Sequence, residues 1–108
     1  MIMKKVLWSE FASDNLRLIF DYHKRKASIT VAKNIKKKIF VATNLLCTQP
    51  DIGQVELWLE HLGEGHRYLN VGNYKIIYKA IEDIVLITDL FDTRQDPKTM
   101  NDKKRNGL

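Results

Sequence analysis

The chain has 108 residues, 44% of them hydrophobic and 29% charged, with a formal net charge of +5. These values are typical of one soluble globular domain and exclude an intrinsically disordered chain. The single cysteine, Cys47, cannot form a disulfide within the chain, and no segment approaches the roughly 18 apolar residues of a membrane span or completes a signal peptide. We therefore expect a cytoplasmic protein in which Cys47 is a small buried side chain.

The N-terminal half predicts a short strand and two helices. Residues 3–8 read as the strand, Ser9 follows as a helix N-cap, and a second helix begins near Ser28. Each helix carries one apolar face at helical spacing, so we expect an antiparallel pair that buries both faces. The first face consists of Ala12, Leu16, Ile19, Phe20 and His23, and the second of Ala32, Ile35, Ile39, Ala42 and Leu46.

Positive charge is concentrated in this half. Residues 1–50 contain ten Lys or Arg and three Asp or Glu, a net of +7, whereas residues 51–108 contain eight and ten, a net of −2. A basic surface attracts nucleic acid or an acidic protein, but a lysine-rich helix face can also be merely solvated. The lysines at 36–38 spread over most of a helical turn, which favours a solvated face.

The C-terminal half predicts strands. After a turn at 50–53, residues 55–60 alternate weakly and 61–65 form a loop. Residues 66–71 and 74–80 flank Gly72-Asn73, a pair typical of a hairpin turn, and residues 84–91 form a third strand. A loop follows at 92–97, and 98–108 is a basic, loose tail. The fold class is therefore α+β: one domain over 1–97, with two helices on one face of a three- to four-stranded antiparallel sheet.

Hairpin pairing assigns side chains to the two faces of this sheet. If Val71 pairs with Tyr74, alternate residues share a face. The mostly apolar face should receive the helices, while the other, which mixes lysines with an aromatic ring, should be open to solvent or a ligand. The first set is Arg67, Leu69, Val71, Tyr74, Ile76 and Tyr78, and the second is Tyr68, Asn70, Lys75, Ile77 and Lys79.

Residues 6–97 resemble the RelE/ParE superfamily of toxins. The resemblance rests on Leu7-Trp8-Ser9, the helical hairpin, Pro50-Asp51-Ile52-Gly53, the sheet hairpin at 67–78 and the ending at 91–97. It implies a growth-inhibiting toxin of a plasmid- or chromosome-stabilising pair. It also implies a cognate antitoxin as partner, which wraps and neutralises the toxin in a hetero-oligomeric complex.

One branch of this superfamily consists of ribosome-dependent mRNA endonucleases. The resemblance assigns Glu56 as the general base and Lys75 and Arg94 as cations that stabilise the phosphate. Lysine lacks the two-pronged geometry of the arginine that the family places at position 75. Nuclease members also carry a tyrosine, or a His-Tyr pair, at or after the last strand, whereas no tyrosine follows Tyr78 here.

The other branch, the ParE-like toxins, inhibits DNA gyrase by binding it and needs no acid–base set. The length of the helical hairpin and the ending Arg94-Gln95-Asp96-Pro97 are closer to this branch, so we favour it. The nuclease stays as the alternative, since His61 or His66 could replace the missing acid. Minor alternatives are a non-toxic nucleic-acid-binding module and an inactive homologue.

Several candidate site residues also have a plainer structural interpretation. Arg94 could brace Asp92 and Asp96, Arg67 could form a structural ion pair, and Glu56 could be an ordinary surface carboxylate. Tyr68 could stack on a base or pack on the antitoxin, while Tyr74 and Tyr78 should belong to the core. The histidines and Cys47 have no metal-ligand spacing, so we expect no metal or cofactor. The target-contact set is Arg67, Tyr68, Lys75, Lys79 and Arg94.

Overall fold

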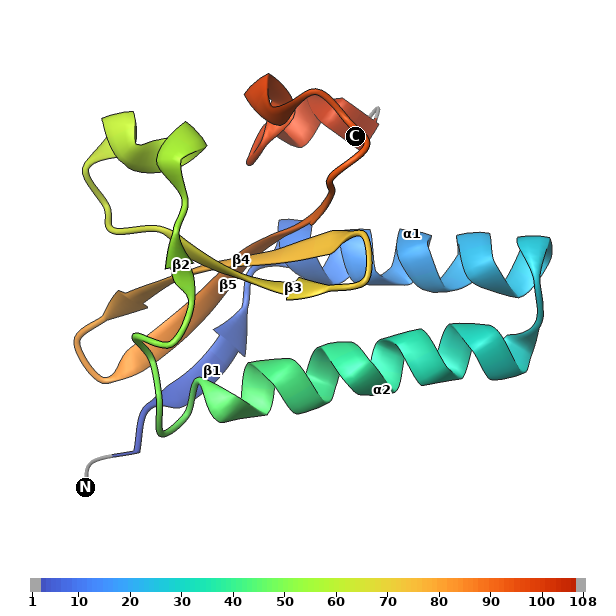
Figure 1. Cartoon of the computed structure of the whole chain (residues 1–108), viewed down its shortest axis with the longest axis horizontal. Helices are drawn as coiled ribbons and strands as arrows, with labels where there is room; N and C mark the ends of the chain where they lie inside the picture. Colours follow the sequence, from blue (N-terminus) through green and yellow to red (C-terminus); the bar gives the residue numbers. More distant parts are fainter. Residues whose placement is uncertain (1–2, 107–108) are drawn as a thin grey trace.

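Two long helices lie against one face of a five-stranded sheet in a computed structural model of the chain, which describes residues 3–106 (Figure 1). Shorter 3-10 helices, labelled η, follow the second and last strands. The elements are β1 (Lys5–Trp8), α1 (Glu10–Lys26), α2 (Ile29–Leu45), β2 (Gln54–Val55), η1 (Leu57–Leu62), β3 (Arg67–Val71), β4 (Tyr74–Ile81), β5 (Ile84–Asp92), η2 (Pro97–Thr99) and η3 (Lys103–Asn106). In the described part of the chain, no helix is both long and apolar enough to cross a membrane.

Both helices begin where the sequence places their caps. The Ser9 hydroxyl accepts a hydrogen bond from the backbone N–H of Ala12 at 3.0 Å, and the Ser28 hydroxyl accepts one from Val31 at 3.1 Å. Each bond satisfies a backbone donor that the first helical turn leaves unpaired. The short connection between α1 and α2 makes the two helices antiparallel neighbours (Figure 1).

The main core lies between the helices and the sheet. It contains most of the predicted apolar faces of both helices and of the hairpin, whereas Phe20, His23, Ala32 and Tyr74 are not among its members. Its fully buried members are Ala12, Ile39, Leu46, Ile76, Tyr78, Val85, Ile87 and Leu90, with Leu16, Ile19, Ile35, Ala42, Leu69 and Val71 packed against them.

The sheet has the strand order β1-β5-β4-β3-β2. Strands β3 and β4 pair antiparallel with Val71 opposite Tyr74, which is the predicted register. The predicted antiparallel sheet of three to four strands is confirmed in β2 to β5, and the N-terminal strand β1 adds a fifth strand that pairs in parallel with β5. The alternation of apolar side chains in β1 predicts which of them are buried, but it does not predict which strand β1 pairs with. The long connection through α1 and α2 allows β1 to pair in parallel with another strand.

The second face of the sheet is partly covered, contrary to the prediction that it is open. Ile77 and Phe91 are buried there beneath Leu59 of η1 and Met100 of the C-terminal segment. The weakly alternating stretch at 55–60 is a strand only as far as Val55, and a 3-10 helix follows. The elements that close this face lie on the side of the sheet away from α2 (Figure 1).

The segment predicted to be a loose tail contains η2 and η3 and contacts the sheet. The guanidinium of Arg105 donates to both carboxylate oxygens of Asp89, at 2.6 and 2.7 Å, and the backbone N–H of Asn101 donates to Asp89 at 2.9 Å. Asp89 is fully buried, so its charge requires such partners. Because the partners lie 12 and 16 residues further along the chain, no local pattern reveals the pairing.

Candidate functional site

The second face of the sheet carries an ion pair between two predicted site residues. The Lys75 ammonium donates to the Glu56 carboxylate at 2.8 Å. Glu56 is only 1% exposed, which corrects its interpretation as a surface carboxylate. Its other oxygen accepts a hydrogen bond from the backbone N–H of Trp58 at 3.2 Å and so caps η1. The carboxylate expected to act as a base is therefore neutralised and occupied at both oxygens.

Tyr68 completes this cluster from β3. The Lys75 ammonium lies 4.1 Å from the centre of the Tyr68 ring, within the range of a cation–π interaction. The Tyr68 hydroxyl donates to the Gln54 side-chain oxygen at 2.9 Å. Three residues predicted from the sequence are thus brought together, because Lys75 contacts both Glu56 and Tyr68.

A second charged group lies near this cluster. The Lys79 ammonium donates to Glu64 at 3.0 Å, which lowers the pKa of that carboxyl group. The buried His66 ring has its Nε2 atom 3.9 Å from Glu64, and its Nδ1 atom has no hydrogen-bond partner among the described residues. Burial lowers the pKa of His66, and the Lys79 charge lowers it further. His66 is therefore a neutral imidazole at neutral pH, which makes it a poor substitute for a missing catalytic acid.

Arg67 holds the turn that precedes β2. Its guanidinium donates to the Gly53 carbonyl at 2.8 Å. The Tyr78 hydroxyl accepts from the Gly53 N–H at 2.9 Å and donates to the Pro50 carbonyl at 2.8 Å. A Cβ atom on Gly53 would lie 2.5 Å from this hydroxyl, so the turn requires glycine. The geometry therefore gives Arg67 a structural contact, although with a backbone carbonyl and not with the expected acidic partner.

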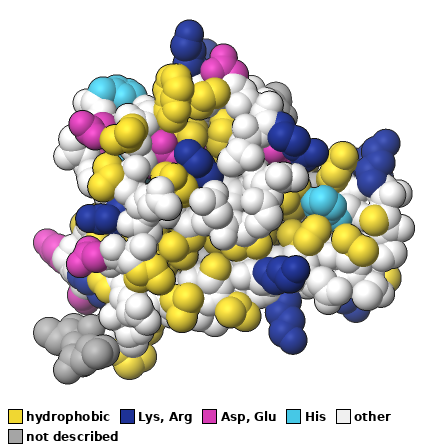
Figure 2. All heavy atoms as spheres, in the orientation of Figure 1, with side chains coloured by type: hydrophobic (Ala, Val, Ile, Leu, Met, Phe, Trp, Pro, Cys, Tyr) yellow, Lys and Arg dark blue, Asp and Glu magenta, His cyan; other side chains and the backbone are white. Residues whose placement is uncertain are grey.

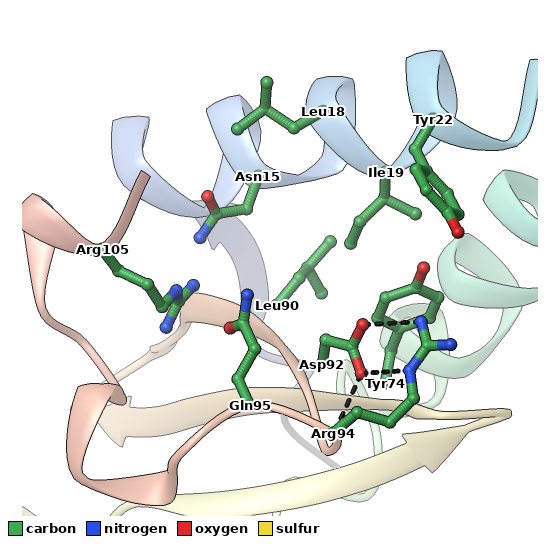
Figure 3. Close-up of a pocket in the computed structure, with 10 residues that line it drawn as sticks. All are labelled: Asn15, Leu18, Ile19, Tyr22, Tyr74, Leu90, Asp92, Arg94, Gln95 and Arg105. Atoms are coloured by element: carbon green, nitrogen blue, oxygen red, sulfur yellow. Dashed lines mark hydrogen bonds and ion pairs between the residues drawn. The ribbon is translucent and has the colours of Figure 1, made fainter. Parts of the chain in front are cut away.

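Arg94 lies in a different part of the molecule, at a pocket of about 340 Å³ between α1 and the end of β5. Figure 3 shows Arg94 reaching toward Asp92 with Tyr22 and Tyr74 beside it, while Asn15 and Arg105 lie at the other end of the pocket. The lining residues are Asn15, Leu18, Ile19, Tyr22, Tyr74, Leu90, Asp92, Arg94, Gln95 and Arg105, and they include neither Glu56 nor Lys75. The three candidate catalytic residues are therefore not assembled at this pocket.

Asp92 braces Arg94 in the predicted manner. The guanidinium donates to the two carboxylate oxygens at 3.0 and 2.7 Å, and the Arg94 backbone N–H donates to the first of them at 2.9 Å. These bonds lower the pKa of Asp92 and raise that of Arg94. Asp96 makes no contact with Arg94; its carboxylate accepts a hydrogen bond from the Lys98 N–H and caps η2.

Tyr74 lines the same pocket. Burial raises the pKa of Tyr74, whose hydroxyl is 2.8 Å from His23 Nε2.

The sequence pattern did not predict one buried polar cluster, which surrounds Asp89. Asp89 accepts hydrogen bonds from the Asn15 amide at 2.8 Å and from Arg105, so it joins α1, β5 and the C-terminal segment. The Arg105 guanidinium lies 5.1 Å from the ring centres of both Phe11 and Phe91. The available signal was a single acidic residue inside the otherwise apolar strand at 84–91, since a buried carboxylate needs a partner.

Metal-ligating side chains do not gather anywhere in the described residues: no group of three or more His, Cys, Asp or Glu is placed to hold an ion. Cys47 is half-buried and free.

Comparison with known proteins identifies one family. The family model described as the ParE toxin of the type II toxin–antitoxin system parDE matches residues 6–97. Among solved structures, the chain is similar to one titled "Chromosomal ParDE TA system from P. aeruginosa", with a TM-score of 0.70 and 14% sequence identity over 83% of this chain and 96% of that chain. No curated protein sequence matches the chain. At this level of identity, the structural likeness shows the fold.

Proposed function

The chain belongs to the ParE toxin family of type II toxin–antitoxin systems, and we propose that it arrests growth by binding DNA gyrase and not by cleaving mRNA. The family match covers both long helices and all of the sheet except Lys5, the first residue of β1.

The state of the candidate catalytic residues supports this choice between the two activities. A nuclease of this superfamily needs a free base and cationic groups around one phosphate. Here Glu56 is buried in an ion pair with Lys75, and Arg94 lies at a separate pocket on Asp92. The chain also lacks a tyrosine after Tyr78 that could protonate the leaving oxygen.

Arg94 is the best-placed cation for contact with the target. Its side chain is 60% exposed, whereas those of Lys75 and Lys79 are each 19% exposed and paired with a glutamate. Asp92 holds the guanidinium in one orientation, which reduces the entropy lost on binding. Tyr68, Lys75 and Lys79 form a second, less exposed candidate contact on the other face of the sheet.

A cognate antitoxin encoded beside this gene completes the proposal. The structural neighbour comes from a system that its title calls ParDE, and this toxin would likewise be held inactive in a cytoplasmic complex until the antitoxin is lost.

Purified toxin and DNA gyrase test the proposed activity. We expect the toxin to inhibit supercoiling, and Arg94→Ala to weaken the inhibition about tenfold because an interface arginine is removed. Lys98→Ala, which removes an exposed charge near the same loop, is the matched control and should inhibit like the wild type. Cleavage of ribosome-bound mRNA by a toxin that leaves gyrase unaffected would overturn the proposal.

A further inference from the structure

The pocket beside Arg94 combines an apolar wall with hydrogen-bond donors at its rim. Its volume of about 340 Å³ lies near the lower end of the range for ligand sites, so it has room for one large side chain. Leu18 and Tyr22, one helical turn apart on α1, are 44% and 40% exposed, while Leu90 of β5 is buried at the same pocket. An exposed leucine and tyrosine at a pocket offer apolar area to a partner side chain.

Several polar groups at this pocket make no hydrogen bond within the described structure. Asp92 accepts hydrogen bonds from Nε and Nη2 of Arg94, whereas Nη1 of Arg94 has no such partner there. The Tyr22 hydroxyl and the Gln95 side-chain amide are likewise without one among residues 3–106. In Figure 3 the Tyr22 ring extends from α1 toward Arg94, and the Gln95 side chain extends into the pocket from the opposite side. A guanidinium can only donate, so the group that fits beside it is an acceptor.

The charges at the pocket leave one accessible cation. Arg105 is only 6% exposed, and buried Asp89 balances its charge from inside the domain. The Arg94 side chain is 60% exposed, and Asp92 occupies only one edge of its guanidinium. Because a guanidinium has five N–H donors in a planar fork, Arg94 can bind a second carboxylate through its remaining donors. Charge-assisted hydrogen bonds of this kind are stronger than those to a neutral acceptor.

We propose that this pocket receives an anchor residue of the toxin's protein target. An aromatic or large aliphatic side chain of the target inserts beside Leu18 and Tyr22, and a carboxylate next to it in the target's chain binds Arg94. Anchors that fill a pocket beside an arginine carry most of the binding energy in many protein interfaces. This inference rests on the proposed function, since the target is taken to be DNA gyrase.

Nucleic acid fits the pocket less well than an acidic protein segment. Proteins that bind nucleic acid place several cations along its phosphate backbone, whereas Arg94 is the accessible cation among the described residues that line this pocket. Figure 2 shows Lys and Arg side chains scattered among hydrophobic ones on the face that it presents, and not gathered in a continuous band. A phosphate bound to Arg94 would also leave the apolar wall uncovered.

Inhibition of DNA gyrase by full-length toxin variants tests the role of the apolar wall. We expect Leu18→Ser and Tyr22→Ser each to weaken inhibition about tenfold, because the anchor loses apolar contacts. Leu45→Ser, which removes an equally exposed leucine from α2, is the matched control and should inhibit like the wild type. All three positions are at least 40% exposed, so the core stays intact, and circular dichroism verifies the fold of each variant.

Titration of short peptides tests the chemistry of the anchor without gyrase. The probes are acetyl-Asp-Phe-amide and two controls, acetyl-Lys-Phe-amide and acetyl-Asp-Gly-amide, each added to the ¹⁵N-labelled full-length toxin. We expect the first peptide to shift the NMR resonances of Leu18, Tyr22 and Arg94, and each control to bind about tenfold more weakly because it lacks the carboxylate or the ring.

Equal inhibition of gyrase by the wild type and both pocket variants overturns the inference, although the proposed function then stands. The inference is also overturned if the Asp-Phe peptide shifts no resonance at the pocket, or shifts them no more than the Lys-Phe peptide does. If the wild-type toxin does not inhibit gyrase, the proposed function fails, while the peptide titration still decides whether the pocket accepts an acidic segment with an aromatic anchor.

Discussion

The ion pair between Glu56 and Lys75 has a structural role on the second face of the sheet. Glu56 is almost completely buried, and its only charged hydrogen-bond partner in the described structure is Lys75. Removal of one member of a buried pair leaves the other charge without compensation. Removal of either member should therefore destabilise the junction between β2, η1 and β4.

This role predicts that Lys75→Ala lowers the free energy of unfolding by about 3 kcal/mol, whereas Glu56→Gln, which removes the charge and keeps the shape, costs about 1 kcal/mol. Chemical denaturation followed by circular dichroism measures both values. Lys98→Ala, which removes an exposed lysine, is the control and should change stability little. Equal stability of Lys75→Ala and the wild type would show that the pair is not structural.

His66 predicts a pH dependence of stability. Burial lowers its folded-state pKa below the usual value of 6.5, so the unfolded chain binds more protons as the pH falls through this region. The free energy of unfolding should therefore decrease as the pH is lowered below about 6.5, and the effect should be absent above it.

Denaturation at about pH 7.5 and about pH 5.5 tests this dependence. His66→Gln should lose less stability between the two values than the wild type, while His61→Gln, at an exposed position, should behave like the wild type. The same loss of stability in His66→Gln as in the wild type would place the pH dependence in other groups.

At the scale of the elements, the C-terminal segment from Pro97 to Asn106, which we call the clasp, packs against the sheet. Arg105 and the backbone of Asn101 supply hydrogen bonds to buried Asp89, and Met100 covers Ile77 and Phe91. The clasp joins the last 3-10 helix to β5, and through Asn15 it also reaches α1.

Deletion of residues 101–108 should therefore destabilise the domain by about 3 kcal/mol, because it removes Arg105, the charged partner of Asp89, and the Asn101 N–H. Addition of Asp89→Asn to the deletion should recover part of the loss, since the uncompensated charge is removed. Thermal unfolding of the three proteins measures the effect. A truncated domain as stable as the whole chain would mean that the segment is not a clasp.

The elements also show how far a sequence determines a fold. The two helices, their serine caps and the register of Val71 with Tyr74 depend on local spacing, and all were predicted. The parallel pairing of β1 with β5 and the clasp on Asp89 depend on contacts between distant residues, which periodicity does not encode. The same limit applies to the site: Glu56, Lys75 and Arg94 were identified as candidates, but their separation into two places follows only from the three-dimensional arrangement.

For the whole molecule, charge and exposed groups divide the surface into regions with different proposed roles. Arg94, beside the pocket between α1 and β5, is the proposed contact with the target, whereas the pair of Glu56 and Lys75 lies on the other face of the sheet and has a structural role.

The most direct test of the central claim is induction of the isolated gene in a bacterial host, with labelled thymidine and labelled methionine followed together. A toxin that acts on gyrase should first reduce thymidine incorporation while methionine incorporation continues. An early collapse of methionine incorporation with DNA synthesis intact would contradict the account, because it would show a ribosome-dependent nuclease despite the paired and separated candidate residues.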